Sequence, residues 1–206
     1  MTDLQKRVST GIVGIAILIL IFYLGLNAIK FSIFVITIEA IRELYNALIN
    51  KGIKLYLPSL LFGALITFVF SILDKNLTFA LVLYFIFNSS LYVLLKDYTL
   101  SNYSFTNMAY FYLVFFLNLL GSLDDIYIII SAFVIAFSTD TFAYFVGSTF
   151  GKHKLIERVS PNKSVEGALG GTFFAIILTS VYFTLLNKYN YIYDINILVI
   201  LLIMLA

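Results

Sequence analysis

Residues 138–171 read STDTFAYFVGSTFGKHKLIERVSPNKSVEGALGG and interrupt a chain that is otherwise mostly apolar. The stretch places an aspartate within an apolar segment and follows it with a basic polar loop, a glutamate and a run of small residues. An ionisable side chain inside a membrane span is costly and usually faces a polar cavity that has a function. Basic side chains at the mouth of such a cavity suit phosphate groups. The stretch therefore predicts membrane helices arranged around a polar site.

The composition excludes a water-soluble domain. Hydrophobic residues make up 62% of the 206 residues, charged residues make up only 12%, and the mean hydropathy is +1.02. Soluble domains have roughly 45–50% apolar residues, so this chain lacks the charges needed to cover a soluble surface. The absence of cysteine and the single histidine exclude disulfides, thiolate sites and multi-histidine metal sites within the chain. We therefore expect an all-α fold, a polytopic bundle of transmembrane helices.

A transmembrane helix needs about 20 mostly apolar residues. By this rule the sequence predicts about eight spans in a single integral membrane domain over residues 1–206. The spans lie near 11–29, 31–49, 57–73, 77–95, 105–121, 125–147 and 168–187, and an eighth begins near residue 191. A helix over residues 191–206 would be only about 24 Å long at about 1.5 Å per residue, which is too short to cross. We expect this last span to be incomplete and the chain to be a fragment or truncated product of a longer protein.

The positions of the basic residues predict how the chain is oriented. With the N-terminus in the cytoplasm, ten of the 13 lysines and arginines fall on the inner side and three on the outer side. The inner residues are Lys6, Arg7, Arg42, Lys51, Lys54, Lys96, Lys152, Lys154, Arg158 and Lys163, and the outer residues are Lys30, Lys75 and Lys188. Because cytoplasmic loops carry an excess of Lys and Arg, we expect a cytoplasmic N-terminus and a cytoplasmic 148–167 loop in the inner (cell) membrane.

Two predicted spans carry charged side chains. Asp140 lies seven residues before Gly147, which places it about 10 Å below the cytoplasmic end of its helix. With Tyr144 and Gly147 it forms a polar face suited to a water-filled funnel; a protonated aspartate bonded to a neighbouring helix is the alternative. In the second predicted span, Glu39 and Arg42 share a helix face. They either form a stabilising ion pair or help to line the polar cavity.

The loop after Gly147 combines features that suit a bound phosphate. Gly147 and Gly151 allow the backbone to turn and to approach a ligand closely. Cationic donors for phosphate oxygens come from Lys152, Lys154, Arg158 and Lys163. Ser160-Pro161 and Ser164 resemble helix starts, and a helix N-terminus favours an anion. Each lysine can also be explained by the tendency of positively charged loops to stay in the cytoplasm. This explanation is weakest for Lys163, because it lies between the two predicted caps.

Three further features of this stretch have more than one explanation. His153 is expected to be an exposed loop residue. Glu166 is suited to a metal or a lysine, or it favours a helix start through the helix dipole. The small residues Gly167, Gly170 and Gly171 form a face for close helix packing, with close approach of a substrate as the alternative.

At these residues the sequence resembles the phosphatidate cytidylyltransferase (CDP-diacylglycerol synthase) family. The matches are Asp140-Thr141-Phe142-Ala143-Tyr144-Phe145 with Gly147, then Phe150-Gly151-Lys152-His153-Lys154-Leu155, then Ser160-Pro161-x-Lys163-Ser164-x-Glu166-Gly167 with Gly170-Gly171. The start of the chain, Gln5-Lys6-Arg7-Val8 to Gly11-Ile12, also resembles that family's N-terminus. Together these motifs are specific, and the resemblance covers most of the chain.

The sequence also departs from the family pattern. Ser148 replaces a basic residue, and Asn162 and Val165 replace a lysine and a tryptophan, whereas Ser164 keeps the hydroxyl of the usual threonine. The family's C-terminal Lys-Asp and Asp-Arg-x-x-Asp elements, which carry its metal-binding carboxylates, are absent from this chain. The metal ligands therefore remain unknown, with Asp140 as one candidate, and an inactive truncated homologue is one alternative.

The resemblance implies cytidylyl transfer from CTP to phosphatidate, which gives CDP-diacylglycerol and pyrophosphate in phospholipid biosynthesis. Mg²⁺ is the implied cofactor because it would neutralise the triphosphate. The implied catalytic residues are Asp140, Ser160, Lys163 and Glu166. The residues implied to bind substrate or nucleotide are Tyr144, Gly147, Gly151, Lys152, Lys154, Asn162 and Ser164. The implied partners are CTP, phosphatidate and the lipid bilayer; a homodimer is compatible with the pattern, and nucleic acid has no role in it.

Two other functions are compatible with parts of the pattern. A CTP-dependent kinase of a lipid alcohol, such as polyprenol or phytol, belongs to the same wider superfamily and releases CDP instead of pyrophosphate. A transporter would use Asp140 as a proton or ion site. Transporters of that kind usually show broken helices in paired halves, and such a pattern is not evident in this sequence.

Overall fold

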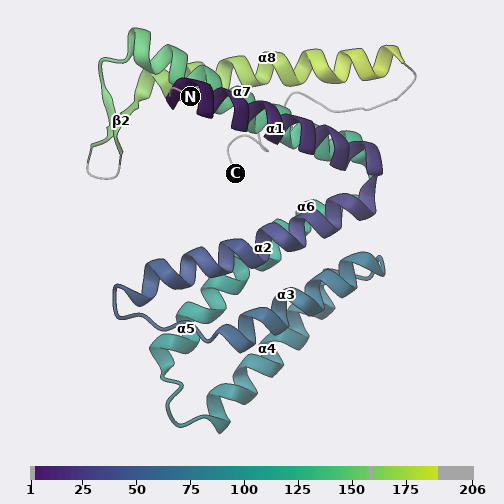
Figure 1. The fold of residues 1–206 in the computed structure, drawn as a ribbon, viewed down its shortest axis with the longest axis vertical. Coiled ribbons are helices and arrows are strands. Elements are labelled where there is room, and N and C mark those ends of the chain that lie inside the picture. The colour runs from purple at the N-terminus through teal and green to yellow at the C-terminus, as the bar shows by residue number, and fades with distance from the viewer. Residues whose placement is uncertain (1–2, 158–159, 190–206) are drawn as a thin grey trace. The chain divides into compact units, whose positions relative to one another are not determined.

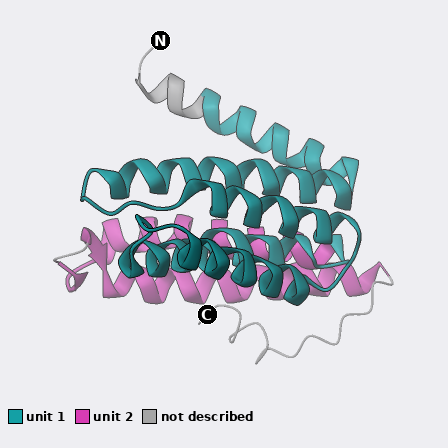
Figure 2. Cartoon of the chain, turned by 90° about the horizontal axis from the view of Figure 1, so that it is seen from below, with its two compact units in different colours: residues 1–126 teal, residues 127–206 magenta. Residues whose placement is uncertain are grey.

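The computed structural model describes residues 3–157 and 160–189, with side chains from Ser9 onward. The chain forms two compact units, residues 1–126 and residues 127–206, which Figure 2 draws in different colours. The eighth span expected from residue 191 lies outside the described residues.

The first unit consists of helices that follow one another along the chain and are joined by short loops (Figure 1). They are α1 (Asp3–Leu24), α2 (Leu26–Ile49), α3 (Leu57–Ile72), α4 (Leu77–Leu94), α5 (Leu100–Ala109), the π-helical turn η1 (Tyr110–Phe115) and α6 (Phe116–Gly121). Gly25 separates α1 from α2 because its φ of 89° is a left-handed backbone conformation that glycine adopts without strain. Asn76 begins α4, and its side-chain oxygen accepts a hydrogen bond from the backbone N–H of Thr78 at 2.9 Å.

An aromatic pair holds the core of the first unit together. The rings of Tyr84 and Tyr110 stack with centroids 3.5 Å apart, and both side chains are fully buried. A Cβ atom at Gly63 would lie 2.7 Å from carbon atoms of both rings. Tyr110 opens the π-helical turn and shares a hydrogen bond with the hydroxyl of Thr67 at 2.9 Å. Only glycine fits at position 63, because any side chain there would push the rings apart.

A buried hydrogen-bond network completes this core. The Asn88 side-chain oxygen accepts hydrogen bonds from the hydroxyl groups of Ser59 at 2.7 Å and Tyr98 at 2.9 Å. The Asn88 amide donates to the side-chain oxygen of Asn107 at 2.7 Å. Tyr98 lies in the loop between α4 and α5, where burial raises the pKa of its phenol and so keeps the proton that it donates. Buried polar groups are costly unless they are paired in this way.

Four helices of the described residues are long and apolar enough to cross a membrane. They are Leu77–Leu94, the continuous rod Leu100–Gly121, Ile126–Phe150 and Val165–Lys188. Ser9–Leu24 and Leu57–Ile72 are shorter apolar helices. The expected all-α membrane fold is thus confirmed as a multi-pass helical membrane protein, and length and composition support four spans where the sequence predicts eight.

Helix α2 also lies where a span was expected, but it carries charged residues. The predicted pair of Glu39 and Arg42 is confirmed, since the guanidinium donates to the carboxylate. Near the start of α2, Lys30 is only 4% exposed and forms an ion pair with Asp74, which follows α3. Loss of Asp74 would leave a buried positive charge without its partner, which is strongly destabilising.

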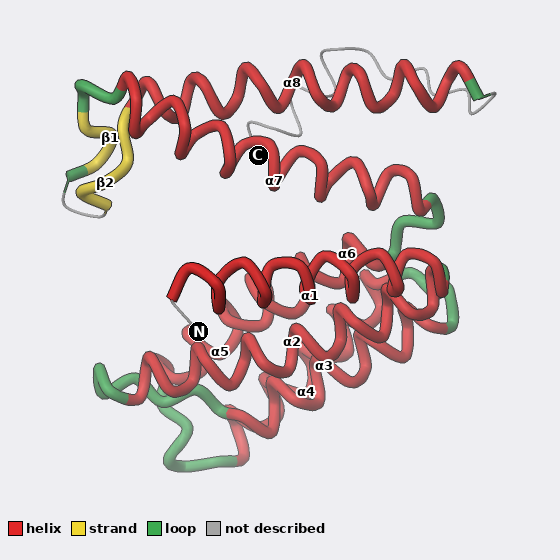
Figure 3. Tube along the Cα trace, turned by 45° about the horizontal axis from the view of Figure 1, so that its top comes forward, coloured by secondary structure: helices red, strands yellow, loops and turns green. Residues whose placement is uncertain are grey.

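The second unit is a helix, a hairpin and a helix (Figure 3). These elements are α7 (Ile126–Phe150), β1 (Lys154–Ile156), β2 (Ser160–Ser164) and α8 (Val165–Lys188). The strands are antiparallel and pair Lys154 with Ser164 and Ile156 with Ser160. The prediction of a helix start at Ser160-Pro161 is wrong, because these residues belong to β2. Proline is tolerated there because a two-stranded hairpin consists of edge strands.

The predicted helix start at Ser164 is confirmed. Its backbone is extended, and its side-chain oxygen accepts a hydrogen bond from the backbone N–H of Gly167 at 3.1 Å. This arrangement satisfies one of the free N–H groups of the first turn of α8, which is worth about 1 kcal/mol. The hairpin therefore passes directly into α8 at Ser164.

Small residues let α7 and α8 pack closely. A Cβ atom at Gly171 would lie 2.7 Å from the carbonyl oxygen of Thr139, and one at Gly167 would lie 3.0 Å from the Cα atom of Gly147. A Cβ atom at Gly170 would lie 2.6 Å from a methyl group of Val146. The predicted close packing by these glycines is confirmed, and it brings the two backbones together beside the hairpin.

Candidate active site

The second unit encloses a cavity of about 1090 Å³ between α7, the hairpin and the first turn of α8. All of its lining residues belong to this unit. Its polar lining consists of Thr139, Asp140, Thr141, Tyr144, Ser148, Ser160, Asn162, Lys163 and Ser164. Ligand sites in proteins usually measure about 300–1,000 Å³. The cavity is therefore large enough for a nucleotide together with part of a second substrate.

Two opposite charges line this cavity from different elements. Asp140 comes from α7 and Lys163 from β2, and both are exposed. Among the described residues that line the cavity, Asp140 supplies the one carboxylate and Lys163 the one ammonium group. The cavity also has an apolar part, which includes Phe145 and Leu155. The site thus combines a cation for phosphates with a surface for an apolar group.

The first turn of α8 also borders the cavity. Ser164 and Gly167 are lining residues, and both are buried. The backbone N–H groups and the positive dipole end of a helix favour an anion. The cavity therefore offers two features that attract negative charge, the Lys163 ammonium group and the α8 N-terminus.

Most of the predicted site residues line the cavity. The lining includes Asp140, Tyr144, Gly147, Ser160, Asn162, Lys163 and Ser164. Four predicted residues are not part of it, namely Gly151, Lys152, Lys154 and Glu166. Arg158 lies outside the described residues. The catalytic and binding roles of all these residues stay predictions.

The four predicted residues outside the lining have structural contacts. The Lys154 ammonium group donates to the carbonyl oxygen of Pro161 across the hairpin. Gly151 lies so close to the end of α7 that a Cβ atom would be 2.2 Å from the carbonyl oxygen of Gly147. The backbone N–H of Lys152 donates to the Glu166 carboxylate at 3.1 Å. These contacts lie within the hairpin and at the ends of the two helices that it joins.

The sequence does not predict the contact between His153 and Glu166. Nδ1 of His153 lies 2.6 Å from Oε1 of Glu166, and the His153 backbone N–H donates to the same carboxylate. His153 is exposed, as expected, but it is also paired. The one feature of the sequence that could have indicated this contact is the position of Glu166 just after the predicted helix start, because a carboxylate there often binds nearby backbone N–H groups.

The donor set of the cavity fits a magnesium ion held jointly with a substrate. Mg²⁺ usually binds one or two protein carboxylates, and substrate phosphates and water complete its coordination. Asp140 is a carboxylate of the required kind, and Thr141 and Ser160 add hydroxyl oxygens to the lining. Within the part of the chain that the structure describes, no group of three or more His, Cys, Asp or Glu residues is placed to hold a metal by itself.

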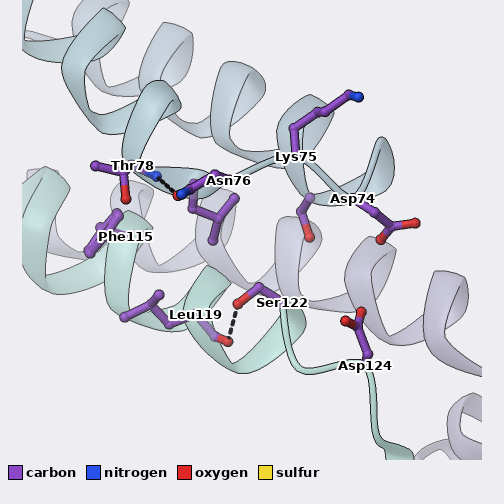
Figure 4. Close-up of a pocket in the computed structure, with 10 residues that line it drawn as sticks. Asp74, Lys75, Asn76, Thr78, Phe115, Leu119, Ser122 and Asp124 are labelled. Atoms are coloured by element: carbon purple, nitrogen blue, oxygen red, sulfur yellow. Dashed lines mark hydrogen bonds between the residues drawn. The ribbon is translucent and has the colours of Figure 1, made fainter.

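A second, smaller cavity of about 420 Å³ lies in the first unit (Figure 4). It is lined by residues of the α3–α4 loop, including Asp74 and Lys75, and by Ser122 and Asp124 after α6. Asp74 is already paired with Lys30. The charges here are mixed and partly neutralised, so the larger cavity of the second unit is the better candidate for an active site.

Comparison with known proteins agrees with the chemistry of the larger cavity. Residues 5–206 match the sequence pattern of the Cytidylyltransferase family. The chain belongs to the cytidylyltransferase family. Membership makes it a nucleotidyltransferase, and this confirms both the resemblance and the enzyme class that the sequence predicts.

Curated members of this family are similar over most of the chain. The phosphatidate cytidylyltransferase of Bacillus subtilis (strain 168) is 30% identical over 199 residues, which cover 88% of this chain and 72% of that protein. The enzyme of the same name from Aquifex aeolicus (strain VF5) is 32% identical over 176 residues, or 72% of this chain and 66% of that protein. A match to the Staphylococcus aureus (strain COL) enzyme is shorter, with 44% identity over 66 residues. No solved structure matches this chain.

Proposed function

We propose that the protein transfers the cytidylyl group of CTP to phosphatidate. A phosphate oxygen of phosphatidate attacks the α-phosphorus of CTP, the bond from that phosphorus to the bridging oxygen breaks, and pyrophosphate leaves. The products are CDP-diacylglycerol and pyrophosphate. The observation that carries the proposal is the cavity in which Asp140, Lys163 and the α8 N-terminus meet, in a chain that belongs to the cytidylyltransferase family.

The charged part and the apolar part of the lining each suit one of the two substrates, CTP and phosphatidate. The triphosphate of CTP binds Lys163 and the first turn of α8, because both favour negative charge. The apolar part with Phe145 and Leu155 accommodates the lipid next to its head group. Reactions at phosphorus are accelerated mainly by positioning and by stabilisation of developing charge. The lining residues Ser160 and Asn162 contribute polar groups to that positioning.

Magnesium is part of the proposal. When bound, it would neutralise negative charge on the triphosphate and assist the leaving pyrophosphate. Asp140 would hold the metal, or it would orient Lys163, which lines the same cavity. Both roles require the carboxylate to face the cavity, which Asp140 lines.

The orientation in the membrane is proposed as well. The N-terminus and the hairpin lie on the cytoplasmic side of the cell membrane, where CTP is available. Helices α1, α2 and α3 cross the bilayer in addition to the four helices that are long and apolar enough by themselves. These seven helices belong to a single membrane domain over residues 1–206. This arrangement is compatible with a homodimer.

The products test the proposal directly. Purified protein in lipid nanodiscs is given CTP labelled in the γ-phosphate, phosphatidate and Mg²⁺. We expect labelled pyrophosphate and unlabelled CDP-diacylglycerol, because the bond at the α-phosphorus breaks. Transfer of the label to a lipid with release of CDP would instead identify the CTP-dependent lipid kinase, for which a lipid alcohol is offered in a parallel reaction. Matched reactions without lipid measure background hydrolysis of CTP.

A further inference from the structure

We propose that His153 and Glu166 form a latch that holds the β1–β2 hairpin, and Lys163 within it, in place over the cavity. Both are positioning residues. The latch itself is a property of the fold, and its effect on catalysis rests on the proposed function.

The Glu166 carboxylate binds the start of the hairpin through both oxygen atoms. Oε2 accepts hydrogen bonds from the backbone N–H groups of Lys152 at 3.1 Å and His153 at 3.2 Å. Oε1 accepts from the His153 ring at 2.6 Å. A carboxylate only accepts hydrogen bonds, so Nδ1 of His153 carries the proton in this contact. Glu166 lies in the first turn of α8 and therefore joins the start of the hairpin to that helix.

His153 contacts α8 at a second point. Its backbone carbonyl oxygen accepts a hydrogen bond from the backbone N–H of Val165 at 2.9 Å. The ring and the backbone of one residue thus bind two consecutive residues of α8, Val165 and Glu166. These two contacts lie immediately before β1, so they set the position at which the hairpin begins.

The hairpin needs such an anchor because it is short and consists of only two strands. β1 has three residues, all exposed, and the register shifts between Lys154 and Ile156. A single two-stranded hairpin is only marginally stable in water. Lys163 is an exposed residue of β2, next to the last residue of the strand. Its position over the cavity therefore depends on the junction of β2 with α8 at Ser164 and on the contacts that hold β1 beside β2.

The contacts also separate this role from direct catalysis. Glu166 and His153 are absent from the residues that line the cavity. Both oxygens of Glu166 are occupied by hydrogen-bond donors of residues 152 and 153. In the structure the carboxylate therefore binds the start of the hairpin. Its removal would affect substrate binding only indirectly, by changing the position of Lys163.

The first experiment measures the position of the hairpin without any substrate. The chain has no cysteine, so Glu157→Cys gives a single site for a nitroxide spin label at the exposed turn position that follows β1. Electron paramagnetic resonance spectra are recorded in nanodiscs for the labelled parent and for His153→Ala, Glu166→Ala and His153→Asn. We expect greater label mobility in both alanine variants. His153→Asn should restore the parent spectrum, because its amide can donate from nearly the same position as Nδ1.

The second experiment measures the consequence for the reaction in the unlabelled protein. Loss of the latch misplaces Lys163, and a misplacement of about 1 Å can cost about 100-fold in rate. We therefore expect kcat/KM for CTP to fall by about 10- to 100-fold in His153→Ala and Glu166→Ala, mainly through a higher KM for CTP, with recovery in His153→Asn. Glu157→Gln is the matched control, since it removes an exposed carboxylate of the same hairpin and should leave kcat/KM unchanged.

Each outcome decides the proposal. Equal label mobility in the parent and both alanine variants would show that the pair does not hold the hairpin. Greater mobility with unchanged kcat/KM would show that the latch exists but does not position a catalytic group, which also overturns the proposal. A parent protein that transfers no cytidylyl group would refute the proposed function instead, and the spectra would still test the latch.

Discussion

Lys163 and Asp140 are the residues on which the proposed chemistry depends, because they place opposite charges in one cavity. Hydrogen bonds to charged groups contribute about 1.5–3 kcal/mol each. We therefore expect Lys163→Ala to lower kcat/KM for CTP by about 10- to 100-fold, and Asp140→Asn to lower activity as well. The assay is formation of CDP-diacylglycerol at a series of CTP concentrations, together with the amount of folded protein in the membrane.

Controls separate these effects from general loss of charge or of structure. Lys188→Ala removes a lysine from the last turn of α8, far along the helix from the cavity, and should leave activity unchanged. Unchanged turnover in Lys163→Ala would remove that residue from the site. If Asp140→Asn lowers the amount of folded protein and not its specific activity, the aspartate is a structural residue bonded to a neighbouring helix.

Helix geometry explains which site residues could be predicted from the sequence. Asp140, Tyr144 and Gly147 are four and three residues apart, a spacing that puts them on one helix face, and all three line the cavity. His153 and Glu166 are 13 residues apart with a hairpin between them. Because no helical or strand periodicity relates two such positions, their contact became visible only in the structure.

At the scale of elements, long apolar runs predicted the helices well. A run of about 20 apolar residues has to become a helix in a bilayer, since only then are its backbone groups paired internally. The hairpin was missed because residues 152–164 are polar and carry no clear alternation of apolar residues. Ser160-Pro161 gave a local helix signal. Pairing with β1, which is not local, places these residues in a strand instead.

The contact between α7 and α8 leads to a prediction about packing. A Cβ atom at Gly171 would already lie 2.7 Å from the Thr139 carbonyl oxygen. Gly171→Leu therefore forces the helices apart, and overpacking of this kind typically costs about 1–3 kcal/mol. We expect a lower unfolding temperature, measured on purified protein in detergent by the temperature at which it aggregates or loses helical circular dichroism.

The matched control for this variant lies on the same helix. Leu169 is 68% exposed, so Leu169→Val changes volume on a face of α8 that has few neighbours within the unit. Its effect should stay within about 0.5 kcal/mol, as for most exposed positions. Equal unfolding temperatures for the two variants would contradict the close approach of α7 and α8.

At the scale of the whole molecule, the number of crossings decides which loops share a side of the membrane. Three helices that are long and apolar enough to cross lie between Lys75 and Glu157, namely Leu77–Leu94, Leu100–Gly121 and Ile126–Phe150. An odd number of crossings puts these two positions on opposite sides. The basic residues then decide the orientation, because the loop that contains Glu157 is rich in lysine.

The cysteine-free chain allows this topology to be tested one position at a time. Lys51→Cys, Lys75→Cys and Glu157→Cys are each exposed to a maleimide that does not cross membranes. In intact cells we expect labelling at position 75 alone, because the proposed orientation places the other two positions in the cytoplasm. Permeabilised cells should label at all three.

Labelling of positions 51 and 75 from the same side would mean that α3 does not cross, since that helix alone separates them. The count of eight spans would then fail. Labelling of position 75 but not position 157 in intact cells would still place the hairpin, and with it the cavity, on the side where CTP is found.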